Sequence, residues 1–143
     1  MEGLKDYKGR EQAYIKHRLL EAYLKRLFMI IGQFQGTICY VDCFAGPWEE
    51  NRDDLMDTSI GISMKIMADC RDALLQMGKD VQFRALYIEK RKRAHAKLQT
   101  FLRANSSPRI NAESLCGEFF DLRKQILGWC GPDDFSFFFI DPK

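Results

Sequence analysis

The composition of this 143-residue chain is that of a globular domain, since 46% of its residues are hydrophobic and 29% are charged. The net charge of +2 is too small to indicate a general electrostatic attraction to nucleic acid or to a membrane surface. No apolar run is long enough to span a bilayer, and residues 1–10 lack the apolar core of a signal peptide, which predicts a cytoplasmic protein with no membrane partner.

The five cysteines, at positions 39, 43, 70, 116 and 130, form no Cys-x-x-Cys pair and are odd in number. Cys39 and Cys43 fall on or beside an apolar strand, where reduced, buried thiols are common. The two histidines, His17 and His95, are far apart in the sequence. These spacings do not favour a metal site, and we expect none.

The first predicted element is an amphipathic helix over 11–34, long enough to cover one face of a sheet. Apolar residues recur along it at spacings of three and four, at Ile15, Leu19, Tyr23, Leu27, Ile30, Ile31 and Phe34. Gly32 and Gly36 mark its end. His17 lies within it, and a solvated or capped histidine is favoured there over a catalytic one.

An apolar strand from Thr37 ends at Asp42 and is followed by a tight turn over 44–47. The acidic stretch 49–54 predicts a solvated loop rather than a metal site. A helix then begins at Thr58 or Ser59 and runs to about residue 77. Gly61, near its start, permits either a close approach of backbone amides to a ligand or close helix packing.

The second half of the chain repeats the alternation of strands and helices. We expect a strand over 81–88 leading to Glu89, a helix over 90–104, a short and weak strand over 109–112, a helix over 119–129 and a strand over 135–140. The helix over 90–104 carries a basic face. Such a face is usually only solvated, and the alternative is a contact with a phosphate-rich partner such as nucleic acid, which this face supports weakly.

Alternation of this kind predicts a mostly parallel sheet with right-handed crossovers. The expected fold is an α/β, Rossmann-like three-layer sandwich in one domain over 1–143. Residues 11–34 form a covering helix, and 37–143 form the sheet and its crossover helices.

Three of the predicted strands end in an acid, at Asp42, Glu89 and Asp141. Ligands of open α/β sheets bind at the carboxyl ends of the strands, where an acid after the second strand accepts hydrogen bonds from ribose hydroxyls. Neither the G-x-G-x-x-G turn that cradles a pyrophosphate nor a P-loop is present. A nucleoside ligand without phosphates fits better, and S-adenosylmethionine is the candidate.

Four segments resemble the motifs of class I methyltransferases, in the same order: Val41-Asp42-Cys43-Phe44-Ala45-Gly46, Tyr87-Ile88-Glu89-Lys90, Gly117-Glu118-Phe119 and Phe138-Phe139-Ile140-Asp141-Pro142. The chain is more narrowly similar to the three-Cys-motif partner (TcmP) family. That similarity is carried by Lys16-His17-x-Leu19-Leu20-x-x-Tyr23-Leu24, by Thr58-Ser59-Ile60 and by Asp42-x-Phe44-Ala45-Gly46-Pro47.

The resemblance implies an S-adenosylmethionine-dependent methyltransferase whose gene lies beside that of a protein bearing a three-cysteine motif. It places Asp42, Phe44, Ala45 and Gly46 at the methionine end of the cofactor, Glu89 at the ribose and Glu118 near the adenine. Asp141, with Pro142, would be the catalytic or substrate-facing element.

The sequence departs from the wider pattern at several positions. Trp48 stands where many methyltransferases have glycine, and Glu118 replaces the more usual Asp. Lys143 follows Asp141-Pro142 where amino-methyltransferases have a second proline, so methylation of an amino nitrogen of a DNA base is not supported. The Pro-Cys nucleophile of cytosine-C5 enzymes is absent, since Cys130 precedes Gly131-Pro132 in the opposite order.

A methyltransferase sheet has more strands than the four predicted here, so we expect a C-terminally truncated domain that holds the cofactor-binding half and is inactive alone. The uncharged strand over 135–140 would become an exposed edge, and such edges pair readily with another strand. A homo-oligomer formed through this edge is therefore expected. The alternative function is a non-catalytic, Rossmann-like protein-interaction module.

Overall fold

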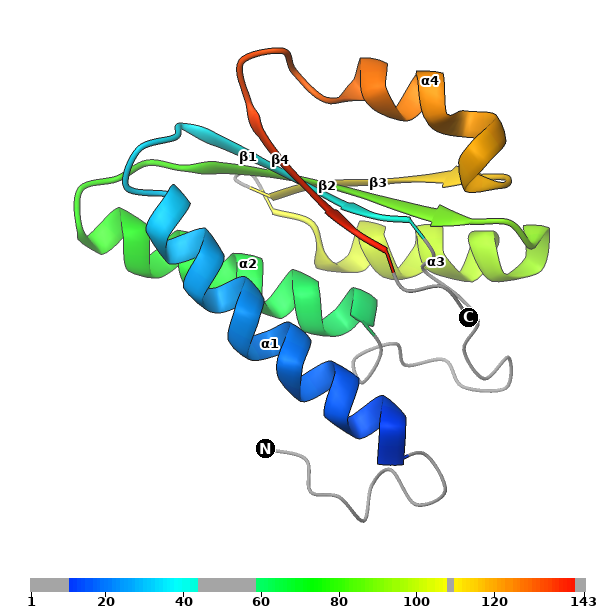
Figure 1. Cartoon of the computed structure of the whole chain (residues 1–143), viewed down its shortest axis with the longest axis horizontal. Helices are drawn as coiled ribbons and strands as arrows, with labels where there is room; N and C mark the ends of the chain where they lie inside the picture. Colours follow the sequence, from blue (N-terminus) through cyan, green and yellow to red (C-terminus); the bar gives the residue numbers. More distant parts are fainter. Residues whose placement is uncertain (1–10, 44–58, 108–109, 141–143) are drawn as a thin grey trace.

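The computed structural model describes residues 11–43, 59–107 and 110–140. Helices and strands alternate along the chain (Figure 1): α1 (Glu11–Ile31), β1 (Thr37–Asp42), α2 (Ser59–Gln76), β2 (Gln82–Glu89), α3 (Lys92–Asn105), β3 (Ile110–Cys116), α4 (Phe119–Trp129) and β4 (Phe135–Phe139). The four strands form one sheet in the order β3-β2-β1-β4, and every neighbouring pair is parallel. The predicted α/β fold with a parallel sheet is confirmed.

Strand β1 lies at the centre of this arrangement, since the chain adds β2 on one side of it and β4 on the other. Asp42, the last residue of β1, is in register with Tyr87 of β2 and with Phe139 of β4. The direction in which strands are added therefore reverses between β1 and β4. In open α/β sheets, this switch point is where a crevice for a ligand forms at the carboxyl edge.

Helices cover the two faces of the sheet unequally (Figure 1). Helices α1, α2 and α3 lie on one face, and α4 lies alone on the other. The larger core cluster unites the first three helices with alternate strand residues such as Ile38, Tyr40 and Phe83. The smaller cluster joins α4 to the intervening strand residues, including Val41 and Leu86. This division follows from the two-residue repeat of a strand, which sends successive side chains to opposite faces.

Helix α1 turns a different side to the sheet from the one expected. Its buried residues are Leu20, Leu24 and Phe28, of which Phe28 packs edge-on against Phe83 with ring centroids 5.3 Å apart. Most of the predicted apolar stripe instead faces outward, with Ile15, Leu19, Tyr23, Ile30 and Phe34 all more than half exposed. The prediction for this stripe was wrong, because α1 has two apolar sides and docking onto α2 and the sheet selects between them.

Several element boundaries also differ from the predictions, most of them by one or two residues. Strand β3 is longer than expected and pairs with β2 along its whole length, from Ile110 to Cys116. Helix α1 ends at Ile31, and residues 32–34 form a turn. Helix α4 has the predicted bounds of residues 119 and 129. In the part of the chain that the structure describes, no helix has the length and apolar character needed to cross a membrane.

Candidate functional site

The carboxyl ends of the four parallel strands meet at one edge of the sheet. Asp42 ends β1 and Glu89 ends β2, and their side chains lie on the same face because Glu89 is two residues beyond Tyr87, the partner of Asp42 in the register. Gly117 and Glu118 follow β3, and Ile140 follows β4. The structure therefore brings the predicted acids of β1, β2 and β3 to one edge.

Asp42 is fully buried and is bonded to the start of the next helix. Its Oδ2 accepts a hydrogen bond of 3.0 Å from the hydroxyl of Ser59, the first residue of α2. A hydrogen bond to a carboxylate is stronger than one between neutral groups. Asp42 thus ties the end of β1 to the N-terminus of α2.

Glu89 is a second buried carboxylate at this edge, with only 3% of its surface exposed. Its Oε1 accepts hydrogen bonds from the backbone N–H of Arg91, at 2.9 Å, and from Arg91 Nε, at 3.4 Å. Its Oε2 is buried and has no hydrogen-bond partner among the described residues. Leaving a buried polar group without a partner costs about 1–3 kcal/mol, and more when the group is charged. Arg91 therefore fixes one oxygen of the Glu89 carboxylate, and the other oxygen is available to accept a hydrogen bond from a hydroxyl or amine.

Two tyrosines lie in the sheet directly beneath the acids. Tyr40 precedes Asp42 by two residues and Tyr87 precedes Glu89 by two, so all four side chains lie on one face. The Tyr87 hydroxyl is 2.6 Å from Ser63 Oγ, and Ser63 donates to the carbonyl of Ile60. The Tyr40 hydroxyl is buried with no hydrogen-bond partner in the described part of the chain.

Burial raises the pKa of both phenols well above the usual value, and the nearby Asp42 carboxylate raises it further in each case. Both hydroxyls are consequently neutral at physiological pH. The floor of the site therefore places uncharged O–H groups below two carboxylates, and hydroxyls of this kind can donate as well as accept.

A glycine, Gly117, follows the carboxyl end of β3 at this edge. The N–H of Gly117 donates to the Glu89 carbonyl at 3.0 Å, and Gly117 has φ of +151°, a backbone angle that disfavours side chains. A Cβ at this position would also lie 3.0 Å from Leu122 Cδ1. Glu118 then occupies the N-cap position of α4, where its exposed side chain makes no capping hydrogen bond. Its carboxylate stands at the surface beside the end of β3.

Several predicted site residues lie outside the described residues. These are Phe44, Ala45 and Gly46 of the turn after β1, and Asp141 and Pro142 after β4. Ile140, the last described residue before them, is 57% exposed.

Three of the five cysteines pack in the interior of the protein. Cys39, Cys43 and Cys70 are buried and unpaired, as expected for the first two. Burial raises the pKa of Cys43 to about 12 and that of Cys70 to about 11. Within residues 11–43, 59–107 and 110–140, no three His, Cys, Asp or Glu side chains cluster as they would around a metal ion.

Comparison with protein-family models, curated proteins and solved structures finds no match. The interpretation of the site therefore depends on the residues of this chain. The buried acids, the reversal of strand order and the unpartnered carboxylate oxygen are its main features.

Sequence reasoning missed the partners that hold the acids in place. Arg91 was assigned to a basic helix face, but it precedes α3 and bonds to Glu89. The buried tyrosines were also missed, although the sequence contains a usable signal. The pattern Tyr-x-acid occurs at the end of both central strands, in Tyr40-Val41-Asp42 and in Tyr87-Ile88-Glu89.

Proposed function

We propose that this chain carries the cofactor-binding half of an S-adenosylmethionine-dependent methyltransferase of the three-Cys-motif partner type. The observation that carries the proposal is Glu89, a buried carboxylate at the end of β2 that has one oxygen held by Arg91 and the other without a partner among the described residues. An acid at this position of a Rossmann-type sheet accepts hydrogen bonds from ribose hydroxyls. The unpartnered Oε2 is the acceptor that such a ligand requires.

The topology supports the same assignment. Strand order reverses between β1 and β4, and the acids lie at the carboxyl edge beside that reversal. The described part of the edge offers carboxylates and neutral hydroxyls, and the Arg91 guanidinium beside them bonds through Nε to the Glu89 carboxylate. A nucleoside that carries no phosphate is the ligand class that fits this donor and acceptor set.

Each acid has a distinct role in this proposal. Glu89 would bind the ribose, and Glu118 would lie near the adenine, since it is exposed at the adjacent end of β3. Asp42 acts through Ser59 by setting the start of α2, and it is better described as a positioning residue for the turn after β1. The bound cofactor would supply an activated methyl group, and the residues of this chain bind and orient it.

A non-catalytic interaction module is the second candidate, and a specific observation favours it. Strand β4 is an edge of the described sheet, and the exposed Tyr23 of α1 lies beside it, with the Tyr23 and Phe137 ring centroids 5.7 Å apart. Large exposed apolar surfaces commonly mark sites of protein association. Such a module, including one that pairs with a second copy or with a three-cysteine-motif protein, would need no cofactor.

Calorimetric titration with S-adenosylmethionine and with adenosine tests the proposal. Glu89→Gln should weaken both by about tenfold, since a hydrogen bond to a charged acceptor is worth roughly 1.5–3 kcal/mol. Glu113→Gln is the matched control, because Glu113 lies on β3 with its carboxylate bonded to Trp129 on the α4 side. It should leave binding unchanged.

A ribose analogue makes the test specific to the assigned contact. In the original chain, 2′,3′-dideoxyadenosine should bind about tenfold more weakly than adenosine, whereas Glu89→Gln should bind the two almost equally. Absence of binding of any of these ligands at millimolar concentration would contradict the cofactor site. It would leave the interaction module as the better assignment.

A further inference from the structure

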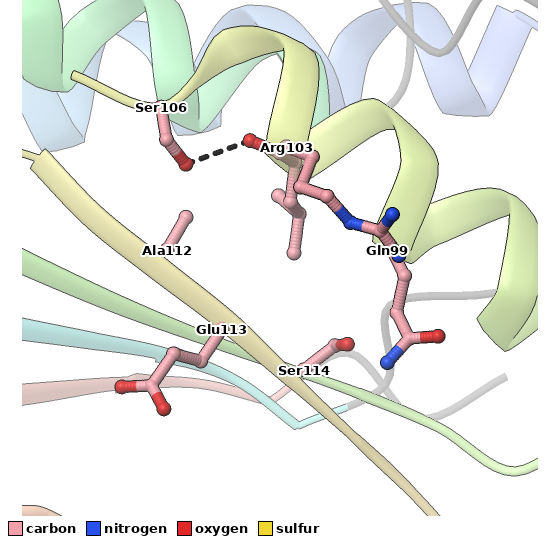
Figure 2. Close-up of a pocket in the computed structure, with 7 residues that line it drawn as sticks. Gln99, Arg103, Ser106, Ala112, Glu113 and Ser114 are labelled. Carbon is pink, nitrogen blue, oxygen red and sulfur yellow. Dashed lines mark hydrogen bonds between the residues drawn. The ribbon is translucent and has the colours of Figure 1, made fainter.

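A groove separate from the carboxyl-edge site lies between helix α3 and the edge strand β3 (Figure 2). Its volume is about 280 Å³. It is lined by Gln99, Leu102, Arg103, Ser106, Ala112, Glu113 and Ser114. Figure 2 shows that the side chains of Gln99 and Arg103 come from the helix wall and that Ser114 comes from the strand wall.

The strand wall of this groove presents free backbone groups. Gly117 N–H donates to the Glu89 carbonyl of β2, so alternate residues of β3 turn their N–H and C=O groups towards β2. The intervening residues Ala112, Ser114 and Cys116 turn theirs away from the sheet. Strand β3 has no neighbour on that side among the described strands.

One outward-facing residue of this edge already has a backbone partner within the chain. Ser107 and Ile110 exchange two backbone hydrogen bonds, of 3.0 and 3.4 Å, in an antiparallel bridge at the beginning of β3. Ile110 belongs to the outward-facing set of residues, and the bridge therefore lies on the open side. Beyond it, no described strand pairs with the outward side of Ala112 to Cys116.

The helix wall supplies uncompensated positive charge. Helix α3 contains no acidic residue, and Lys92 and Arg103 are eleven positions apart on the same exposed side as Gln99. Neither basic side chain forms a salt bridge within the described part of the chain. The one acid of the groove, Glu113, is directed to the other face of the sheet, where its Oε2 accepts a hydrogen bond of 2.8 Å from Trp129 Nε1.

We propose that this groove binds an extended, acidic peptide of a partner protein, which adds to β3 as a further strand. Backbone bonds to Ala112, Ser114 and Cys116 would provide the pairing. Alternate side chains of the peptide would point towards α3, where carboxylates meet Arg103 and Lys92. The lining contains no aromatic residue on which nucleic-acid bases could stack, and this favours a peptide over a single-stranded nucleic acid.

Fluorescence polarisation of the 143-residue chain with a labelled six-residue peptide of alternating glutamate and valine tests the proposal. We expect saturable binding at physiological salt. Arg103→Glu should weaken it about fivefold to tenfold, because an attractive contact becomes repulsive. Lys124→Glu, an equal change of charge at an exposed position of α4, is the control and should have little effect.

Two further measurements separate strand addition from simple charge attraction. Ala112→Pro removes an outward N–H, a change that edge strands tolerate, and it should weaken binding while circular dichroism shows an unchanged fold. The same peptide with every amide N-methylated keeps its charge and should bind at least tenfold more weakly. Equal binding of the methylated peptide, failure of the original peptide to bind, or tighter binding of a ten-residue oligothymidine would each overturn the proposal.

Discussion

The two tyrosines beneath the site provide a matched pair of substitutions. Tyr40 and Tyr87 are both fully buried on the same face of adjacent strands, with ring centroids 6.1 Å apart. Ser63 lowers the pKa of both phenols and so lies near both, and its Oγ is within hydrogen-bond distance, 2.6 Å, of the Tyr87 hydroxyl. The Tyr40 hydroxyl has no partner among the described residues. The two Tyr→Phe changes are therefore chemically identical and differ mainly in the hydrogen bond that is lost.

Tyr87→Phe should lower the free energy of unfolding by about 1 kcal/mol, the usual net value of an intramolecular hydrogen bond. Tyr40→Phe should leave that free energy unchanged or raise it by about 1 kcal/mol, because it removes a buried hydroxyl that makes no hydrogen bond. The two variants should thus differ by about 1–2 kcal/mol.

Urea unfolding followed by tryptophan fluorescence measures this difference, with the m-value as a check that the denatured state is the same. If Tyr40→Phe destabilises the protein as much as Tyr87→Phe, the Tyr40 hydroxyl has a partner and the reasoning about the floor of the site is wrong.

Two further predictions concern pH and association. Because burial raises the thiol pKa values of Cys43 and Cys70 from 9.0 to about 12 and about 11, the unfolded chain loses these protons first. Stability should fall between pH 9 and pH 11 by at most about 1.4 kcal/mol per pH unit for each thiol, and urea unfolding of Cys70→Ala should show a shallower fall. At the β4 edge, we expect light scattering to detect self-association at micromolar concentration. Ser136→Pro, which removes a backbone N–H that faces away from β1, should reduce it, and a monomeric original chain would contradict the expected pairing.

The fold was largely predictable because local pattern and topology agree. Apolar strands that end in acids at Asp42 and Glu89 alternate with helices, and parallel strands place such acids at one edge. Strand β3 was underestimated because Glu113 and Ser114 give it the polar character of an edge strand, which a pattern of hydrophobic residues does not detect.

The remaining differences were set by tertiary contacts. Helix α1 offers two apolar stripes, and its periodicity cannot show that Leu20, Leu24 and Phe28 face the sheet while Leu19 and Tyr23 do not. The placement of Asp42, Glu89 and Glu118 at one edge of the sheet was also predictable, because each acid closely follows or ends a parallel strand. The role of Arg91 depends on the exact start of α3, which sequence patterns locate to within only a few residues.

The unequal covering of the sheet gives the two ends of the proposed site different local stabilities. Ile126 is the one buried residue of α4, whereas α1, α2 and α3 share the large core cluster with Tyr87. Elements with few buried contacts open at lower free energy than the core does. Amide hydrogens of α4 should therefore exchange by local opening, and Glu118 would move with them while Glu89 stays fixed in the sheet. The proposed ribose-binding end would stay folded with the core of the sheet, whereas the proposed adenine-binding end would be lost whenever α4 unfolds locally.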